Sequence, residues 1–127
     1  MEINREDLEY KNRLCGFFRS MKLEKRNALM DRVLNDRTRY VTVGLENIYQ
    51  PHNASAVLRS CDCFGVQDVH IIENSYHYEL NPHVSLGAAQ WLNLYRYNTQ
   101  DNNTAECINN LKKEGYRVTY FKPVGNR

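Results

Sequence analysis

The spacing of apolar residues along the chain predicts two helices followed by alternating strands and helices. In residues 5–18 and 22–35, apolar side chains recur every three or four positions, which is typical of amphipathic helices. From residue 39 onward, short runs that are rich in β-branched residues or alternate between apolar and polar residues are separated by helical patterns. The expected strands are residues 39–45, 69–72, 91–97 and 116–121, and the helices between them are 53–64 and one that follows the capping run 101–104 and ends at Gly115. This alternation predicts an α/β fold with a largely parallel sheet.

The clearest pattern is the segment 45–66, where a strand leads through a polar loop into a helix and on to the next strand. Asn53 is a favourable N-cap for this helix, and Gly65 is a natural residue to end it. In such units ligands bind at the carboxyl ends of the strands. The polar residues at that position are Glu46, Asn47, His52 and Asn53. Arg59 follows inside the helix, although an asparagine that only caps a helix and an arginine that is only solvated on its surface are ordinary alternatives.

Charge changes this picture for the first part of the chain. The formal net charge of the 127 residues is only +2, but residues 1–40 hold ten Lys or Arg and seven Asp or Glu. A basic segment on a near-neutral body suits a partner with a phosphate backbone, and a solvated helix surface is the alternative. With 42% hydrophobic and 25% charged residues, the composition is that of a globular chain long enough for one domain.

Other classes of protein find little support in the sequence. No apolar run approaches the length of a membrane span, and the charged first ten residues do not resemble a signal peptide. Of the four cysteines, Cys61 and Cys63 fall on different faces of the expected helix, so we expect reduced thiols and no metal site. These features are typical of a cytoplasmic protein. The chain also lacks the glycine-rich motifs of dinucleotide-binding and P-loop proteins.

The sequence PHNASAVLR at 51–59, with Glu46 before it and a Gly-Val pair at 65–66 after it, resembles the first signature motif of the SpoU/TrmH family. These proteins are RNA 2′-O-methyltransferases of the knotted SPOUT class. Residues 84–89 followed by Trp91 resemble the family's small-residue turn and the strand after it. Residues 115–118 are similar to the usual entry to the next strand, so the resemblance covers about residues 38–121.

The resemblance implies a largely parallel sheet of the SPOUT (α/β-knot) type, cut before the knot. Residues 1–37 would be an N-terminal helical extension that contacts RNA, and residues 38–127 the N-terminal part of the methyltransferase domain. The later family motifs, which hold S-adenosylmethionine in the knot, have no counterpart after Phe121. The cofactor-binding residues are therefore unknown, and S-adenosylmethionine is not expected to bind tightly to this chain alone.

The function that the resemblance implies is S-adenosylmethionine-dependent 2′-O-methylation of a ribose in RNA. The basic first helices and the first motif favour a tRNA guanosine as the target. By resemblance Arg59 is the catalytic arginine, and Asn53 orients it or the ribose. A guanidinium has too high a pKa to act as a base, so Arg59 is expected to position the ribose and stabilise charge. The residues expected to bind the substrate are Glu46, His52, Ser55, Arg19, Lys22 and Arg26.

Two other functions stay open at this point. The chain could be a non-catalytic RNA-binding module derived from the family, or its substrate could be ribosomal RNA. An unrelated small α/β binding domain with a coincidental motif is a further alternative. Family members dimerise largely through the knotted part, so the resemblance implies a homodimer for the complete protein and leaves the assembly of this chain open.

Overall fold

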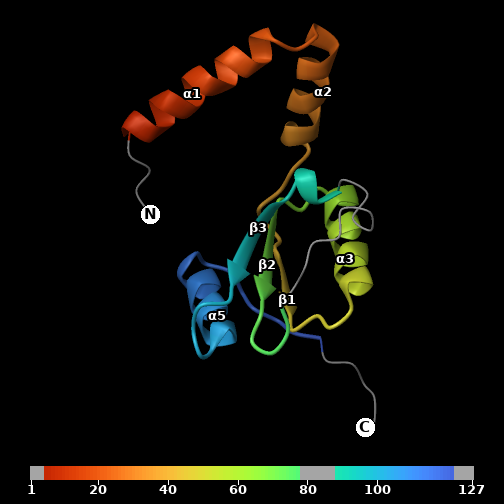
Figure 1. Cartoon of the computed structure of the whole chain (residues 1–127), viewed down its shortest axis with the longest axis vertical. Helices are drawn as coiled ribbons and strands as arrows, with labels where there is room; N and C mark the ends of the chain where they lie inside the picture. The colour runs from red at the N-terminus through yellow and green to blue at the C-terminus, as the bar shows by residue number, and fades with distance from the viewer. Residues whose placement is uncertain (1–4, 78–87, 122–127) are drawn as a thin grey trace. The chain divides into compact units, whose positions relative to one another are not determined.

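The computed structural model describes residues 5–77 and 88–121 (Figure 1). The chain divides into two compact units, Met1–Arg37 and Thr38–Arg127. Part of the expected small-residue turn (84–87) and the last six residues lie outside the described residues.

The first unit consists of two helices, α1 (Arg5–Ser20) and α2 (Glu24–Asn35), close to the predicted bounds. The turn between them is held by the Asn27 side chain, whose Nδ2 donates to the Arg19 carbonyl at 3.0 Å. Among residues 7–37, for which burial is described, no side chain is buried. The apolar stripe of α1 is therefore exposed, and its members are Leu8, Leu14, Phe17 and Phe18.

The second unit is built on a three-stranded parallel sheet in the order β1-β2-β3 (Figure 1). The strands are β1 (Val43–Glu46), β2 (Asp68–Ile72) and β3 (Asn93–Tyr97). Every residue of the central strand β2 is buried, because it is paired on both sides and covered on both faces. The predicted parallel α/β architecture is confirmed by this sheet.

Helices cover the two faces of the sheet (Figure 1). Helix α3 (Pro51–Cys63) buries Ala54, Leu58 and Cys61 against Leu45, Val69 and Ile71. Helix α5 (Asn103–Lys113) buries Cys107 and Leu111 against Ile72. Since neighbouring residues of a strand point to opposite faces, Ile71 and Ile72 serve the two different cores. A short 3₁₀ helix, η1 (Ala88–Gln90), precedes β3.

Both helices of the second unit end as the sequence predicts. Gly65 and Gly115 have φ angles of 72° and 91°, the left-handed region that glycine adopts readily. After α3, the Val66 N–H donates to the Cys61 carbonyl at 2.9 Å. After α5, the Tyr116 N–H donates to the Leu111 carbonyl at 3.0 Å. These bonds satisfy carbonyl groups that the end of a helix leaves unpaired.

The start of α5 also matches the prediction, whereas the start of α3 does not. Asn102 caps α5, its side chain accepting from the Ala105 N–H at 3.0 Å. Asn53 was expected to cap α3, but the helix begins earlier, with Gln50 as N-cap and Pro51 at its first position. Proline is favoured there because its missing N–H would have no helical partner and its φ is already helical. Asn53 therefore lies inside the first turn.

The expected fourth strand is wrong. Residues 116–121 form no strand in the structure, and the sheet of the described residues has three strands. Tyr116 contacts the core beside Cys107 and Leu111, and its hydroxyl donates to the Arg39 carbonyl. Further along, Tyr120 and Phe121 are exposed. The alternating pattern of this segment suits a strand, but a strand forms only where a neighbouring strand accepts its backbone hydrogen bonds.

Candidate functional site

The candidate site lies at the carboxyl ends of the three parallel strands. Glu46 ends β1, Glu73 directly follows β2, and Asn98 directly follows β3. This is the edge at which open α/β sheets bind ligands. The sequence analysis placed Glu46 and Asn47 here, but it named neither Glu73 nor Asn98 as a site residue, and it treated residues 101–104 only as a helix cap.

Glu46 is tied to the start of α5. Its Oε1 accepts from the Thr104 hydroxyl at 2.6 Å, and the same hydroxyl oxygen accepts from Asn74 Nδ2 at 2.7 Å. Asn74 Oδ1 in turn accepts from the Asn103 N–H at 3.0 Å. These bonds join the end of β1, the loop after β2 and the first turn of α5, and they fix the Glu46 carboxylate in one orientation.

Asn47 joins the loops that follow β1 and β2. Its φ is 48°, a left-handed conformation that asparagine tolerates better than most residues. Its N–H donates to the Ile72 carbonyl at 2.9 Å, and its Oδ1 accepts from the N–H groups of Asn74 and Ser75, each at 2.9 Å. One side chain thereby satisfies two backbone donors of the neighbouring loop.

Glu73 is a buried carboxylate, with 4% of its surface exposed. Its Oε2 accepts from Asn98 Nδ2 at 3.0 Å, and Arg96 Nη1 lies 3.9 Å from its Oε1. Its backbone carbonyl accepts from Asn103 Nδ2 at 3.1 Å. A buried carboxylate needs such partners, because burial without them is costly. Its place directly after a strand was the available sequence signal for this residue.

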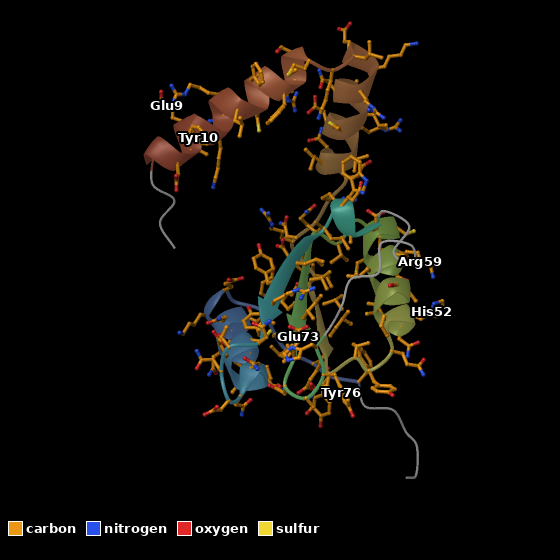
Figure 2. The ribbon with its side chains drawn as sticks, viewed as in Figure 1. Glu9, Tyr10, His52, Arg59, Glu73 and Tyr76 are labelled. Carbon is orange, nitrogen blue, oxygen red and sulfur yellow. The ribbon has the colours of Figure 1, made fainter. Side chains whose placement is uncertain are left out.

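The predicted site residues of α3 do not form one cluster. His52 and Asn53 are exposed in the first turn, and Arg59 is half-buried. On a helix, residues 52 and 59 lie on the same side about two turns apart, and residue 53 lies about 120° away from residue 59. Figure 2 shows His52 and Arg59 on the same outward side of α3. Within the described part of the chain, no hydrogen bond or ion pair joins Arg59 to Asn53 or Glu46.

Ser55 is fully buried, and its hydroxyl donates to the Pro51 carbonyl at 2.9 Å. In this structure its polar group is used inside the helix, at the turn that begins it. The expected contact between Ser55 and RNA stays a prediction.

The predicted RNA-binding residues of the first unit differ in their surroundings. Arg19 forms two hydrogen bonds with the Asp31 carboxylate, one of them 3.1 Å long, and this contact lowers the pKa of Asp31. Lys22 Nζ lies 3.8 Å from the sulfur of Met30. Lys22 and Arg26 are exposed. The charge of Arg19 is partly balanced, so Lys22 and Arg26 are the better placed of the three to meet a phosphate.

A second polar group lies on the face of the sheet that α5 covers. His70 is buried, stacks on Tyr95 with ring centres 5.0 Å apart, and has its Nδ1 3.3 Å from the Tyr97 hydroxyl. Burial lowers the pKa of His70, and the carboxylates of Glu114 and Asp68 oppose that shift. The imidazole is therefore held in its neutral form near pH 7.

A cavity of about 500 Å³ lies on the side of the sheet that faces α5. It is lined by β1 and the segment before it, by one side of α5 and by residues 115–120. The described residues contain no group of three potential metal ligands. Among the helices described, none is long and apolar enough to span a bilayer.

Comparison with known proteins gives a consistent result. The profile of the SpoU rRNA Methylase family matches residues 40–127. A tRNA (guanosine(18)-2′-O)-methyltransferase of Borreliella burgdorferi is 42% identical over 95 residues, which cover 75% of this chain and 42% of that protein. The protein of the same name from Thermus thermophilus is 33% identical over 95 residues, which cover 75% of this chain and 47% of that protein.

A solved structure has the same fold. The crystal structure of the A. aeolicus TrmH/SpoU tRNA modifying enzyme superposes with a TM-score of 0.61 at 24% identity, over 72% of this chain and 45% of that one. The chain thus spans less than half the length of these relatives. Because the family profile matches more than half of the 127 residues, the chain belongs to the SpoU rRNA Methylase family.

Proposed function

We propose that this chain takes part in S-adenosylmethionine-dependent 2′-O-methylation of a ribose in RNA, with a tRNA guanosine as the target. The observation that carries the proposal is the 42% identity to a protein named tRNA (guanosine(18)-2′-O)-methyltransferase, over 95 residues of this chain. In this proposal, residues 38–127 are the N-terminal part of the methyltransferase domain. The family description names rRNA, so ribosomal RNA is the second candidate substrate.

Arg59 is the residue to which we assign the central role. Methylation of a 2′-hydroxyl requires that the hydroxyl be aligned, that it lose its proton, and that water be kept away. A guanidinium is a planar fork of donors that can hold ribose and phosphate oxygens together. It cannot take up a further proton, so Arg59 positions the ribose and stabilises the developing charge. The half-buried position of Arg59 on the outer side of α3 leaves its guanidinium accessible to RNA.

In this proposal Asn53 and His52 contact the same substrate, and Glu46 supports the loop that leads to them. Asn53 and His52 are exposed in the first turn of α3, where they can donate to or accept from the ribose and the neighbouring phosphate. Glu46 is held by Thr104 and keeps the loop between β1 and α3 in place. Helices α1 and α2, with the turn between them, contribute Lys22 and Arg26 to the phosphate backbone, with Arg19 in a lesser part.

S-adenosylmethionine supplies the methyl group in the proposed reaction. The described residues do not fit its binding by themselves. The polar groups at the carboxyl ends of the strands are already engaged with one another, as in the contacts of Glu46 with Thr104 and of Glu73 with Asn98. We therefore propose that this chain alone does not bind the cofactor tightly. Calorimetric titration with S-adenosylmethionine tests this, and tight binding would contradict it.

Arg59 is best tested in a protein whose remaining part is intact. Residues 40–127 would replace the matching segment of the Borreliella burgdorferi relative, and 2′-O-methylguanosine in a tRNA transcript would be measured by mass spectrometry. We expect the chimera to methylate tRNA, and Arg59→Ala to lower kcat/KM by roughly a hundredfold or more, since both alignment and charge stabilisation are lost. Arg59→Lys keeps the charge without the fork and should recover only part of the rate.

The control is Lys113→Ala in the same chimera, because Lys113 is an exposed basic residue in the last turn of α5, outside the proposed RNA-binding residues. Full activity of Arg59→Ala would show that the assignment of Arg59 is wrong. A chimera that binds tRNA as the relative does but transfers no methyl group would favour the non-catalytic RNA-binding module. Methylation of ribosomal RNA in place of tRNA would favour the second candidate substrate.

A further inference from the structure

Two exposed tyrosines form a pair at the carboxyl end of the sheet. Tyr49 lies in the loop after β1 and Tyr76 in the loop after β2, with ring centres 5.1 Å apart and planes at 70°. They are 72% and 49% exposed. Figure 2 shows Tyr76 at the end of the sheet where Glu73 lies. Single exposed aromatic residues are common, so the pair needs further support before it indicates a site.

The pair is held in place from below. The loops that carry it are joined by Asn47, whose Oδ1 accepts from the Asn74 and Ser75 N–H groups just before Tyr76. Tyr76 also lines a small apolar recess with Leu45 and Ile48. Tyr76 is thus placed beside core residues, and the ring of Tyr49 packs against the ring of Tyr76. A surface that is ordered before it binds loses little conformational freedom on binding.

The groups beside the tyrosine pair favour a partner that carries a negative charge. Directly after Tyr49, the helix α3 begins at Pro51 with no acidic residue in its first turn. The positive end of a helix dipole favours an anionic group, and His52 adds an exposed donor at the same place. A flat aromatic group beside an anionic group is the chemistry of a nucleotide. Unpaired bases of RNA are commonly recognised by stacking on tyrosine.

We propose that Tyr49 and Tyr76 form a stacking surface for an unpaired base of the RNA substrate, beside the first turn of α3. The inference rests on the proposed function, because it takes RNA as the ligand. The stacking surface adds an uncharged contact to the base of a nucleotide. The basic side chains of α1 and α2 would instead contact the phosphate backbone.

The test measures binding of the 127-residue chain to a labelled tRNA transcript by fluorescence anisotropy at several salt concentrations. Tyr49→Ala and Tyr76→Ala should each raise Kd roughly fivefold to a hundredfold, the range measured for loss of one base–aromatic stack. Tyr49→Phe and Tyr76→Phe keep the ring and should bind like the wild type. The slope of log Kd against log salt should not change, because no phosphate contact is lost.

Tyr40→Ala is the matched control, since Tyr40 is 92% exposed and precedes β1 at the opposite end of the sheet. A second measurement needs no variant. An RNA oligonucleotide with 2-aminopurine in a run of pyrimidines should lose fluorescence when the wild-type chain binds it and the base stacks on a tyrosine. Thermal unfolding of each variant shows whether the fold is intact.

Three outcomes would overturn the proposal. If the wild type binds tRNA and both alanine variants bind equally well, the stacking surface is wrong while the proposed function stands. If the phenylalanine variants are as weak as the alanine variants, the hydroxyl groups and not the rings make the contact. If the wild-type chain binds no RNA, then this inference fails together with the RNA-binding part of the proposed function.

Discussion

A buried histidine makes the stability of the second unit depend on pH. His70 is 5% exposed and contacts the rings of Tyr95 and Tyr97, and burial lowers its pKa from an ordinary value of 6.5. The carboxylates of Asp68 and Glu114 act in the opposite direction but do not cancel the shift. The unfolded chain therefore takes up a proton at a pH at which the folded chain does not, and protonation favours unfolding.

The contribution of His70 to the free energy of unfolding is complete above about pH 6.5 and is lost as the pH falls toward the lowered pKa of the folded state. Urea unfolding between about pH 7.5 and 5.5 should show this loss. His70→Gln, which cannot be charged, should flatten the dependence. His52→Gln is the control because His52 is exposed. If the free energy of unfolding of His70→Gln falls with pH as steeply as that of the wild type, other groups cause the pH dependence.

Single residues also show where sequence reasoning succeeds and where it stops. Gly65 and Gly115 were predicted as helix ends because the requirement is local, and the structure confirms both. The role of Asn47 could not be predicted, since its side chain bonds to the backbone of Asn74 and Ser75, far along the sequence. Pairing of the strands creates that neighbourhood, and no short pattern records it.

Among the secondary structure elements, the end of α5 offers a sharp test of backbone strain. Gly115 has φ of 91°, and a Cβ added there would meet no atom within 4 Å, so only the backbone opposes a substitution. Gly115→Ala should lower the free energy of unfolding by about 1–2 kcal/mol. Gly44 in β1 has the same open space without the positive φ, so Gly44→Ala should be neutral or slightly stabilising. Equal effects of the two substitutions in urea unfolding would contradict this explanation.

The elements were largely predictable from hydrophobic period alone. The described helices α1, α2, α3 and α5 and the strands β2 and β3 fall close to where the pattern placed them, because most have one face or both faces in a core. The first strand was predicted from residue 39, but β1 begins only at Val43, where pairing with β2 begins. The segment 116–121 carries an equally good strand pattern and is not a strand. A pattern of alternation reports the local preference of the chain, whereas a strand also needs a partner whose presence the segment itself does not specify.

The place of the candidate site in the fold was predictable from the sequence, but most of the residues that form it were not. The rule that ligands bind at the carboxyl ends of parallel strands pointed to Glu46 and Asn47. The same rule applied to the other two strands would have found Glu73 and Asn98. The contact between Glu46 and Thr104 joins residues 58 apart in sequence, so only the fold reveals it.

For the whole molecule, the division into two units predicts separable stability and binding. Neither core cluster includes a described residue of the first unit. A chain reduced to residues 38–127 should therefore unfold at nearly the same temperature as the full chain. It should bind tRNA more weakly and with a shallower salt dependence, since the removed segment carries Lys22, Arg26 and other basic residues.

Thermal unfolding and anisotropy titration of the two chains check this expectation. A charge-matched control is the full chain with Lys22→Gln and Arg26→Gln, which should reproduce part of the loss in affinity without shortening the protein. Equal tRNA affinity of the full and shortened chains would show that the helices are not part of the RNA-binding surface.

The central position of β2 also determines which strands of the second unit can unfold locally. Each amide of β2 lies between two neighbouring strands and below two layers of side chains, whereas β1 and β3 each have β2 on one side only. Amide protons of β2 are therefore expected to exchange with solvent only when the whole unit unfolds, and those of β1 by a smaller opening of its edge. Glu46 ends β1 and the loop with Tyr49 follows it, so an opening of this edge would displace part of the candidate site while β2 stays paired with β3.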